Sequence, residues 1–353
     1  MFTISLDEHK ANMAALPLIP DERSTTGPQL VGIAKLAAEG EQIREGHNVE
    51  YFTLTSRSIL TKCSAGDRMP FTWTINPYRG CEFACKYCYA RYTHEFMEMR
   101  DGYSFEQKIF VKQHTASLLR RELKRVKPHE DIAIGTATDP YQPAEHRYGV
   151  TRAILEEFGR HRGFSIGLVS KSQLITRDID VLQEVSKHNS IAIHVTVTTT
   201  DIELARKLEP RAPRPDLRLQ GLKQLREAGI NAGVICAPVL PGITDSRANL
   251  DAVVKAAKDA GAAYIYCNPL FLKPCSMKVF MPFLEKEFPH LVPAYQKRYE
   301  KEAYVSKTYR RQLVALLENL CHKHGMPERQ ERQKIREFIA AETERKAEQM
   351  RLF

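Results

Sequence analysis

The sequence predicts an α/β fold with a parallel sheet, followed by a helical C-terminal region. Six short apolar segments, rich in β-branched and aromatic residues, alternate with amphipathic segments of about 12 to 15 residues. This alternation is typical of repeated strand–helix–strand units, which build parallel sheets. Beyond about residue 278 only helical patterns remain. At 353 residues, the chain can bury the large core that such a fold requires.

The strands are predicted where short apolar runs end in small, polar or turn-forming residues. The first run is PFTWTINPY, and the second, DIAIGTATD, reads as a buried strand that ends in small and polar residues. The later runs have the same character, and the last, AAYIYCNPL, closes the series. The predicted strands cover residues 70–78, 131–139, 164–172, 191–201, 230–242 and 262–270.

Helices are predicted between these strands, where apolar residues recur at helical spacing. They cover residues 112–126, 152–161, 177–188, 216–229 and 246–261. The first 50 residues are polar and patternless, and we expect them to be loosely ordered. The chain therefore divides into a polar N-terminal extension over residues 1–54, an α/β domain over 55–277 and a helical region over 278–353.

Composition and charge narrow the class of protein. Hydrophobic residues make up 43% and charged residues 27% of the chain, which is ordinary for a globular protein. No run of about 18 apolar residues is present, so no membrane span is predicted. Because the N-terminus also lacks the order of a signal peptide, we expect a cytoplasmic protein whose thiols stay reduced. The net charge of +9 favours an anionic partner.

Small and polar residues gather at the ends of several predicted strands. In parallel α/β folds, ligand sites form at the carboxyl ends of the strands. A cysteine-rich loop also leaves the end of the first predicted strand, so all these groups should face one opening. The strand-end residues are Thr136, Thr138, Asp139, Ser170, Lys171, Ser172, Thr198, Thr199 and Thr200.

Three of the eight cysteines, Cys81, Cys85 and Cys88, fall within eight positions. In a reducing compartment such a group binds metal or performs chemistry more readily than it forms disulfides. Three thiolates and His94 would complete a zinc site. A [4Fe–4S] cluster held by only three thiolates would instead keep one iron open for substrate or cofactor, as a catalytic cluster needs. The cysteines themselves leave both alternatives open.

The cysteine spacing and several other segments resemble a known enzyme family. Cys-x-x-x-Cys-x-x-Cys, with Tyr87 directly before Cys88, resembles the signature of the radical S-adenosylmethionine (radical SAM) superfamily. NPYRGCEFACKYCYAR, GTATDPYQPAE, SKSQLITRDID, LEPRAPRPDLRL and APVLPGITD come in the order found in the subgroup related to spore photoproduct lyase, often labelled DNA-repair-photolyase-like. The resemblance covers about residues 55–290.

This resemblance implies a partial (β/α)6 barrel of the TIM-like type, in which Cys81, Cys85 and Cys88 hold a [4Fe–4S] cluster. SAM would chelate the open iron, and a reductant such as flavodoxin or ferredoxin would supply one electron. Cleavage of SAM would then give a 5′-deoxyadenosyl radical that takes a hydrogen atom from the substrate. A barrel mouth would shield this radical from water and position the reacting carbon.

The resemblance also implies a SAM site at the strand ends. Tyr87 would lie near the adenine, or else pack beside the cluster. Thr138 and Asp139 would bind the amino group of SAM, unless Asp139 only begins a turn. Lys171, next to Ser170, would pair with the SAM carboxylate, with a solvated lysine as the alternative.

Further roles are assigned to two threonines and two cysteines. Thr198 and Thr199 would reach the ribose hydroxyls, or else be ordinary strand formers with bonded hydroxyls. Cys267 and Cys275 lie near the end of the sixth predicted strand. They would relay a hydrogen atom, ligate a second cluster or remain buried free thiols.

One segment departs from the pattern of the subgroup. Spore photoproduct lyases carry a hydrogen-donor cysteine in a Cys-Thr-Ser-Asp-like run at the end of the second strand. This sequence reads Thr-Ala-Thr-Asp over residues 136–139 and has no thiol there. Direct reversal of the spore photoproduct by that donor route is therefore doubtful, unless Cys267 or a tyrosine substitutes.

Nucleic acid is the favoured substrate class. Residues 294–312, AYQKRYEKEAYVSKTYRRQ, interleave tyrosines with lysines and arginines, which suits phosphate binding and base stacking unless these are ordinary helices with partly buried tyrosines. Residues 208–218, LEPRAPRPDLR, present arginines that either recognise an anion or pair within the loop. The alternatives are radical SAM modification of a peptide or small metabolite, and a non-catalytic cysteine-rich metal-binding protein.

Overall fold

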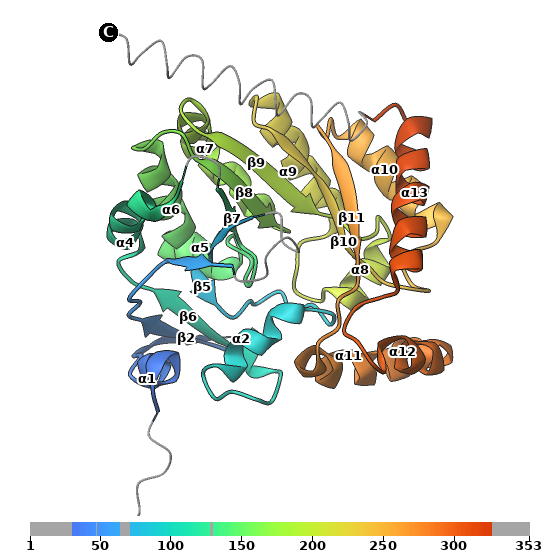
Figure 1. Cartoon of the computed structure of the whole chain (residues 1–353), viewed down its shortest axis with the longest axis horizontal. Coiled ribbons are helices and arrows are strands. Elements are labelled where there is room, and N and C mark those ends of the chain that lie inside the picture. The colour runs from blue at the N-terminus through green and yellow to red at the C-terminus, as the bar shows by residue number, and fades with distance from the viewer. Residues whose placement is uncertain (1–29, 47, 64–70, 128–129, 327–353) are drawn as a thin grey trace, which may run out of the picture.

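The computed structural model describes residues 30–46, 48–63, 71–127 and 130–326, and a seven-stranded sheet lies at its centre (Figure 1). Six strands run parallel and are ordered across the sheet as they are along the chain. They are β4 (Trp73–Ile75), β7 (Asp131–Ile134), β8 (Ser165–Ser170), β9 (Ser190–Thr196), β10 (Ala232–Val239) and β11 (Ile265–Pro269). These strands confirm the predicted α/β fold with a parallel sheet.

The barrel is partial because the sheet keeps two edges. One edge is β11, and the other is β3 (Leu60–Lys62), which pairs antiparallel with β4. The strands are shorter than predicted at their carboxyl ends. Residues 135–139, 197–201 and 240–242, for example, lie in loops beyond the sheet. The polar residues at these positions therefore belong to loops at the mouth of the barrel, where a site is expected.

Helices surround the sheet and continue into a C-terminal group (Figure 1). The helices between the parallel strands are α4 (Thr115–Glu122), α5 (Pro143–Tyr148), α6 (Val150–Gly159), α7 (Ile179–Ser186), α8 (Ile202–Leu208), α9 (Pro215–Glu227) and α10 (Arg247–Asp259). The C-terminal helices are α11 (Pro274–Glu287), α12 (Val292–Tyr299) and α13 (Lys307–Lys323), as predicted. Helix α13 packs against α10 and β11, and so covers one edge of the sheet. None of the helices within the described residues is long and apolar enough to cross a membrane.

A second, four-stranded sheet was not predicted. Its order is β1-β2-β6-β5. The strands are β1 (Gln42–Gly46), β2 (Val49–Leu54), β6 (Lys108–Lys112) and β5 (Tyr78–Arg79), with α1 (Gly32–Ala38) before them and the short helices α2 (Tyr92–Glu95) and α3 (Ser104–Gln107) nearby in sequence. The expectation of a loosely ordered N-terminal stretch is wrong for its described part, because β2 gains its partner from β6, far along the chain. The part of that stretch before residue 30 lies outside the described residues, and the division at residues 54 and 277 stays a prediction.

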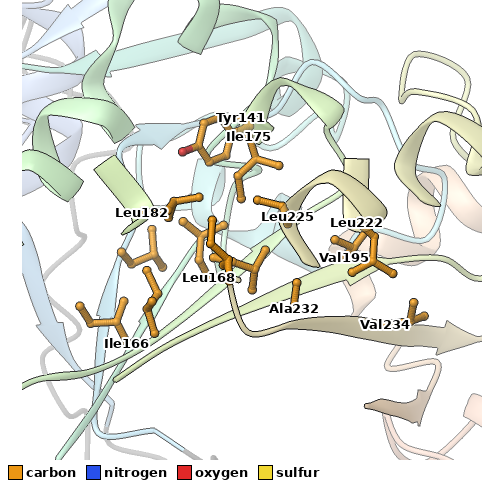
Figure 2. Close-up of a cluster of buried hydrophobic side chains, with 14 of the residues drawn as sticks. Tyr141, Ile166, Leu168, Ile175, Leu182, Val195, Leu222, Leu225, Ala232 and Val234 are labelled. Carbon is orange, nitrogen blue, oxygen red and sulfur yellow. The ribbon is translucent and has the colours of Figure 1, made fainter. Parts of the chain in front are cut away.

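The main core lies between the parallel sheet and the helices around it. Figure 2 shows part of it, where side chains of the strands meet side chains of α7 and α9. Each large aliphatic side chain buried in this way contributes about 1.5 to 3 kcal/mol. Those labelled include Ile166, Leu168, Leu182, Val195, Leu222, Leu225 and Val234, all of which are buried.

Candidate active site

The three clustered cysteines lie in residues 80–88, which we call the cysteine loop. The loop follows β5 and leads into a short 3-10 helix, Tyr89–Arg91, and then α2. Cys81 and Cys85 are buried and Cys88 is partly buried. They belong to a second core to which the ends of β10 and β11 and the helices α11 and α12 contribute Leu240, Leu270, Phe280 and Tyr295. The C-terminal helices therefore help to shield the thiols from water.

The cysteine loop needs unusual backbone conformations at two positions. Gly80 has a φ of 85°, and a Cβ there would lie 2.6 Å from the carbonyl oxygen of Lys108. Only glycine avoids both the strain and the clash. Ala84 has a φ of 55°, in the left-handed region that costs about 1 to 2 kcal/mol for a residue with a side chain. The surrounding structure must hold this turn in place.

Hydrogen bonds to neighbouring segments fix the start of the loop. The Gly80 carbonyl accepts from the Thr138 hydroxyl at 2.6 Å and from the Gln142 amide at 3.2 Å. The Cys81 amide donates to the Phe105 carbonyl at 2.9 Å. The Thr138 hydroxyl therefore donates its hydrogen bond to the cysteine loop. This contact explains its place at the strand end without a ligand.

Other side chains fix the end of the loop. Arg91 donates to the Cys85 carbonyl at 3.0 Å and forms a buried ion pair with Glu106 at 2.6 Å. Ser276 of α11 donates to the Cys88 carbonyl at 2.9 Å. With both ends anchored, the three thiols are preorganised by their protein surroundings.

The three thiols lie within electrostatic reach of one another. Burial raises the pKa of Cys81, and the nearby Asp139 carboxylate and Cys85 raise it further. Burial also raises the pKa of Cys85, to about 12, and that of Cys88. Thiolates in such a site need cationic compensation, which the iron of a cluster supplies. The donor set thus fits a [4Fe–4S] cluster held at three corners.

The zinc alternative requires His94 beside the cysteines, but its ring points elsewhere. Its Nε2 lies 3.0 Å from the Lys108 carbonyl oxygen, and the ring packs edge-on against Phe105 and Phe110. Burial lowers the pKa of His94 to about 4. Across the described part of the chain, no three His, Cys, Asp or Glu side chains lie close enough together to bind one metal ion. A cluster needs no such convergence, because each cysteine binds a different iron.

The structure brings four of the predicted SAM residues together. The Asp139 carboxylate accepts from the Ser170 hydroxyl and from the Lys171 amide, both at 2.7 Å, and from the Tyr141 amide at 2.9 Å. It thereby ties the loop after β7 to the end of β8. Burial raises the pKa of Asp139, although these donors oppose the rise. The Lys171 ammonium lies 5.8 Å from the centre of the Tyr87 ring, so Tyr87 belongs to the same group.

A buried ion pair within residues 208–218 lies beside Tyr87, as the alternative of pairing within this segment predicts. The Tyr87 hydroxyl donates to Glu209, and Glu209 pairs with Arg218 of α9. Arg218 also donates to the carbonyls of Thr196 at 3.1 Å and Pro213 at 2.7 Å. Burial raises the pKa of Glu209, but Arg218 leads the cations that hold it below its ordinary value. The carboxylate therefore stays charged inside the protein.

Lys171 keeps its charge within the site. Burial lowers its pKa, but Cys85 and Glu209 outweigh burial and raise it to about 12. Its ammonium is therefore protonated at neutral pH. It can attract a carboxylate without any change of protonation.

Thr198 and Thr199 are both buried after β9 but differ in their hydrogen bonds. The Thr199 hydroxyl accepts from the Asp201 amide at 3.1 Å. The Thr198 hydroxyl has no hydrogen-bond partner among the described residues. Leaving such a group unpaired costs about 1 to 3 kcal/mol. A ligand hydroxyl, such as one of the SAM ribose, would remove this penalty.

The two cysteines predicted to relay a hydrogen atom lie apart. Cys275 is buried at the start of α11, next to the serine that binds the Cys88 carbonyl. Cys267 is buried on β11, where burial raises its pKa to about 12 and Cys321 and Glu318 of α13 add to the rise. Cys267 therefore faces the helices outside the sheet. The structure does not bring it to the cysteine loop, and a relay through Cys275 stays a prediction.

The fold and the site define an enzyme with an iron–sulfur centre at the mouth of a partial barrel, and comparisons with known proteins give the family. A family model described as the radical SAM superfamily matches residues 75–252. An uncharacterized protein of Mycobacterium tuberculosis is 32% identical over 307 residues, which cover 87% of this chain and 89% of that protein. An uncharacterized protein of Methanocaldococcus jannaschii is 29% identical over 217 residues, 62% of this chain and 76% of that protein.

Among solved structures, spore photoproduct lyase shares the fold. Its complex with dinucleoside spore photoproduct has a TM-score of 0.56 and 12% identity, over 78% of this chain and 79% of that chain. A mutant with bound AdoMet and the same photoproduct has a TM-score of 0.56 and 13% identity, over 77% and 79% of the two chains. At this identity the likeness concerns the fold alone.

The chain belongs to the radical SAM superfamily. It is therefore an enzyme that uses a [4Fe–4S] cluster and SAM and requires a reductant. This confirms the predicted cofactors and excludes the non-catalytic alternative.

Proposed function

We propose that this radical SAM enzyme acts on a nucleic acid. When bound, the cluster and SAM supply the reductive cleavage that yields a 5′-deoxyadenosyl radical, which abstracts hydrogen from the substrate. Cys81, Cys85 and Cys88 are the ligands of the cluster in this proposal. Lys171 attracts the SAM carboxylate, and the Thr198 hydroxyl pairs with the ribose.

The observation that carries the proposal is a group of three basic side chains near the cysteine loop that form no salt bridge among the described residues. They are Arg79 of β5, Lys112 of β6 and Lys273, which precedes α11. None of them forms a salt bridge within the part of the chain that the structure describes. Successive phosphates of a nucleic acid would supply the missing anions.

Arg79 acts electrostatically on Lys112, and Arg79 and Lys273 share Tyr92 as a neighbour. The Arg79 guanidinium reaches the Thr93 carbonyl at 3.5 Å, and its buried Nε has no partner among the described residues. Burial and the charge of Arg79 lower the pKa of Lys112 to about 7. Lys273 lies 3.6 Å from the centre of the Tyr92 ring, and Arg79 in turn lowers the pKa of Tyr92 against the effect of burial. An anion bound here would relieve the repulsion between Arg79 and Lys112.

Two further features support the proposal. The chain carries 52 lysines and arginines against 43 acidic residues, an excess that favours polyanions. Spore photoproduct lyase, which shares the fold, is described in complex with a dinucleoside photoproduct. A flavodoxin or ferredoxin is the proposed reductant, and the cytoplasm, where thiols stay reduced, is the proposed location.

The test combines binding with turnover. Anaerobically reconstituted enzyme is titrated against a fluorescein-labelled single-stranded 20-nucleotide DNA at several salt concentrations. We expect salt-dependent binding, and the Lys273→Gln variant should lower the slope of the log–log salt plot by about 0.7. Lys255→Gln, an exposed lysine of α10, is the matched control. Formation of 5′-deoxyadenosine should rise when the DNA is added to enzyme, SAM and dithionite.

A contrary result would be equally clear. If DNA and RNA, single-stranded and duplex, neither bind at low salt nor raise 5′-deoxyadenosine formation, the substrate is not a nucleic acid. A rise with a peptide or metabolite fraction would then identify the alternative class.

A further inference from the structure

We propose that Tyr304, Phe271 and Tyr89 form a stacking platform for one unpaired base of the substrate, and that Lys273 binds the adjoining phosphate. This inference rests on the proposed nucleic-acid function and deepens it, because it names the surface that presents the nucleotide. We call these four residues the base platform.

The geometry of the rings carries the inference. Phe271 and Tyr304 stack with their centres 4.4 Å apart and their planes at 26°. Tyr89 lies 6.1 Å from Phe271 at a tilt of 53°. Tyr304 is 55% exposed and Tyr89 is 37% exposed, although both rings contact Phe271. A contiguous exposed aromatic group of this kind marks a binding surface rather than scattered surface residues.

The charge beside the rings favours a nucleotide. The Lys273 ammonium lies 5.8 Å from the centre of the Phe271 ring, and 3.6 Å from that of Tyr92, so it is held beside the platform by two aromatic faces. It has no acidic partner among the described residues, as noted above. A flat apolar face next to an unpaired cation matches a base joined to its phosphate.

The chain itself and two hydrogen bonds hold the platform together beside the cysteine loop. Tyr89 directly follows Cys88, and its hydroxyl donates to the Thr136 carbonyl after β7. The Leu272 amide donates to the Ala303 carbonyl at 2.9 Å, which joins the segment of Phe271 to that of Tyr304. The platform is thus assembled from three distant segments and fixed beside the thiols. A nucleotide held there would lie next to the radical chemistry.

The base must be unpaired and unstacked. Within a duplex both faces of a base are covered by its neighbours, so a protein ring reaches a base face only in single strands, at ends or after extrusion. The platform therefore favours single-stranded, damaged or mispaired sites over intact duplex. This preference distinguishes it from a surface that binds only the phosphate backbone.

The experiment uses a single-stranded DNA with 2-aminopurine at one position, because stacking on an aromatic ring quenches the fluorescence of this base. We expect quenching by wild-type enzyme and by Tyr304→Phe, and loss of quenching in Tyr304→Ala even at saturating protein. Affinity should fall about tenfold or more in Tyr304→Ala, since one lost stacking contact has an effect of this size. Iron content and the thermal unfolding midpoint serve as checks of folding.

The outcomes separate this inference from the proposed function. If wild-type enzyme binds no nucleic acid, both fail. If it binds but Tyr304→Ala and Phe271→Ala bind and quench as wild type does, the base platform is wrong while the nucleic-acid function stands. Equal affinity of wild-type enzyme for intact duplex and for single strands would also overturn the platform.

Discussion

The substitution Glu209→Gln tests whether the buried ion pair beside Tyr87 holds the site together. Glu209 and Arg218 have side chains that are 0% and 1% exposed, and Arg218 keeps only two backbone carbonyls once the carboxylate is neutral. The amide can still accept from the Tyr87 hydroxyl, so the change removes charge with little change of shape. Removing one partner of a buried pair costs about 3 to 5 kcal/mol, because the other charge is left uncompensated. Because Arg218 keeps its two carbonyl contacts, the expected loss of unfolding free energy lies at the lower end of this range, about 3 kcal/mol.

The assay is urea unfolding of the enzyme under anaerobic conditions, with the free energy of unfolding taken by linear extrapolation. Asp216→Asn is the matched control. Arg214 and Asp216 are also in direct contact, at 2.6 Å, but their side chains are 49% and 47% exposed. Exposed pairs are worth about 0 to 1 kcal/mol, so the control should lose less than about 1 kcal/mol.

A double variant sharpens the test. Glu209→Gln with Arg218→Met removes the orphaned charge as well, so it should recover most of the about 3 kcal/mol lost in Glu209→Gln alone. The reasoning is refuted if Glu209→Gln loses no more than Asp216→Asn, or if the double variant is less stable than either single variant.

Three further outcomes are expected. Gly80→Ala should destabilise the protein by more than about 2 kcal/mol and lower the iron content after reconstitution, because its Cβ would lie 2.6 Å from the Lys108 carbonyl at a φ of 85°; iron retention equal to that of wild type would contradict this. Thr198→Val removes an unpaired buried hydroxyl that we assign to the ribose, so it should raise the free energy of unfolding without SAM by about 1 kcal/mol. The same variant should bind SAM several-fold more weakly by calorimetry. If the variant is more stable and binds SAM as tightly as wild type or more tightly, the assignment to the ribose is wrong. The pKa of Lys112 falls from 10.5 to about 7 on folding, so between pH 7 and 10.5 the unfolded chain holds a proton that the folded chain lacks, and the free energy of unfolding rises with pH. Lys112→Met should flatten this rise of the urea midpoint with pH. A pH dependence equal to that of wild type would argue against the lowered pKa.

The sequence predicts the central sheet well because its strands are buried on both faces. A strand such as Ala232–Val239, in which residues 232–236 are all buried, is read from its own composition, without knowledge of its neighbours. The second sheet cannot be predicted from local composition in this way. Its strand Val49–Leu54 is only partly buried and depends on pairing with Lys108–Lys112, more than fifty residues away. Long-range pairing of short, half-exposed strands leaves little signal in local composition.

Some residues of the candidate site can likewise be predicted from local sequence, and others cannot. Cys81, Cys85 and Cys88 are identified by their spacing, because the loop that presents them is short and contiguous. The sequence leaves open whether Arg218 recognises an anion or pairs within residues 208–218. It became part of the site only because Glu209, nine residues earlier, is buried against it. Partners that come together through tertiary packing are seen only in the folded chain.

The C-terminal helices explain how a partial barrel holds its cysteine loop at an open side. The loop follows β5, which comes just after the first parallel strand, β4. Helix α11 begins just after the last parallel strand, β11, and β4 and β11 do not pair with each other. The link is made instead by Ser276 of α11, which binds the Cys88 carbonyl, and by Phe280 and Tyr295, which pack in the core that contains the thiols. Loss of α11 and α12 would release the end of the loop and expose the thiols to water. These helices are therefore part of the active site, since they complete the enclosure that the six parallel strands leave open.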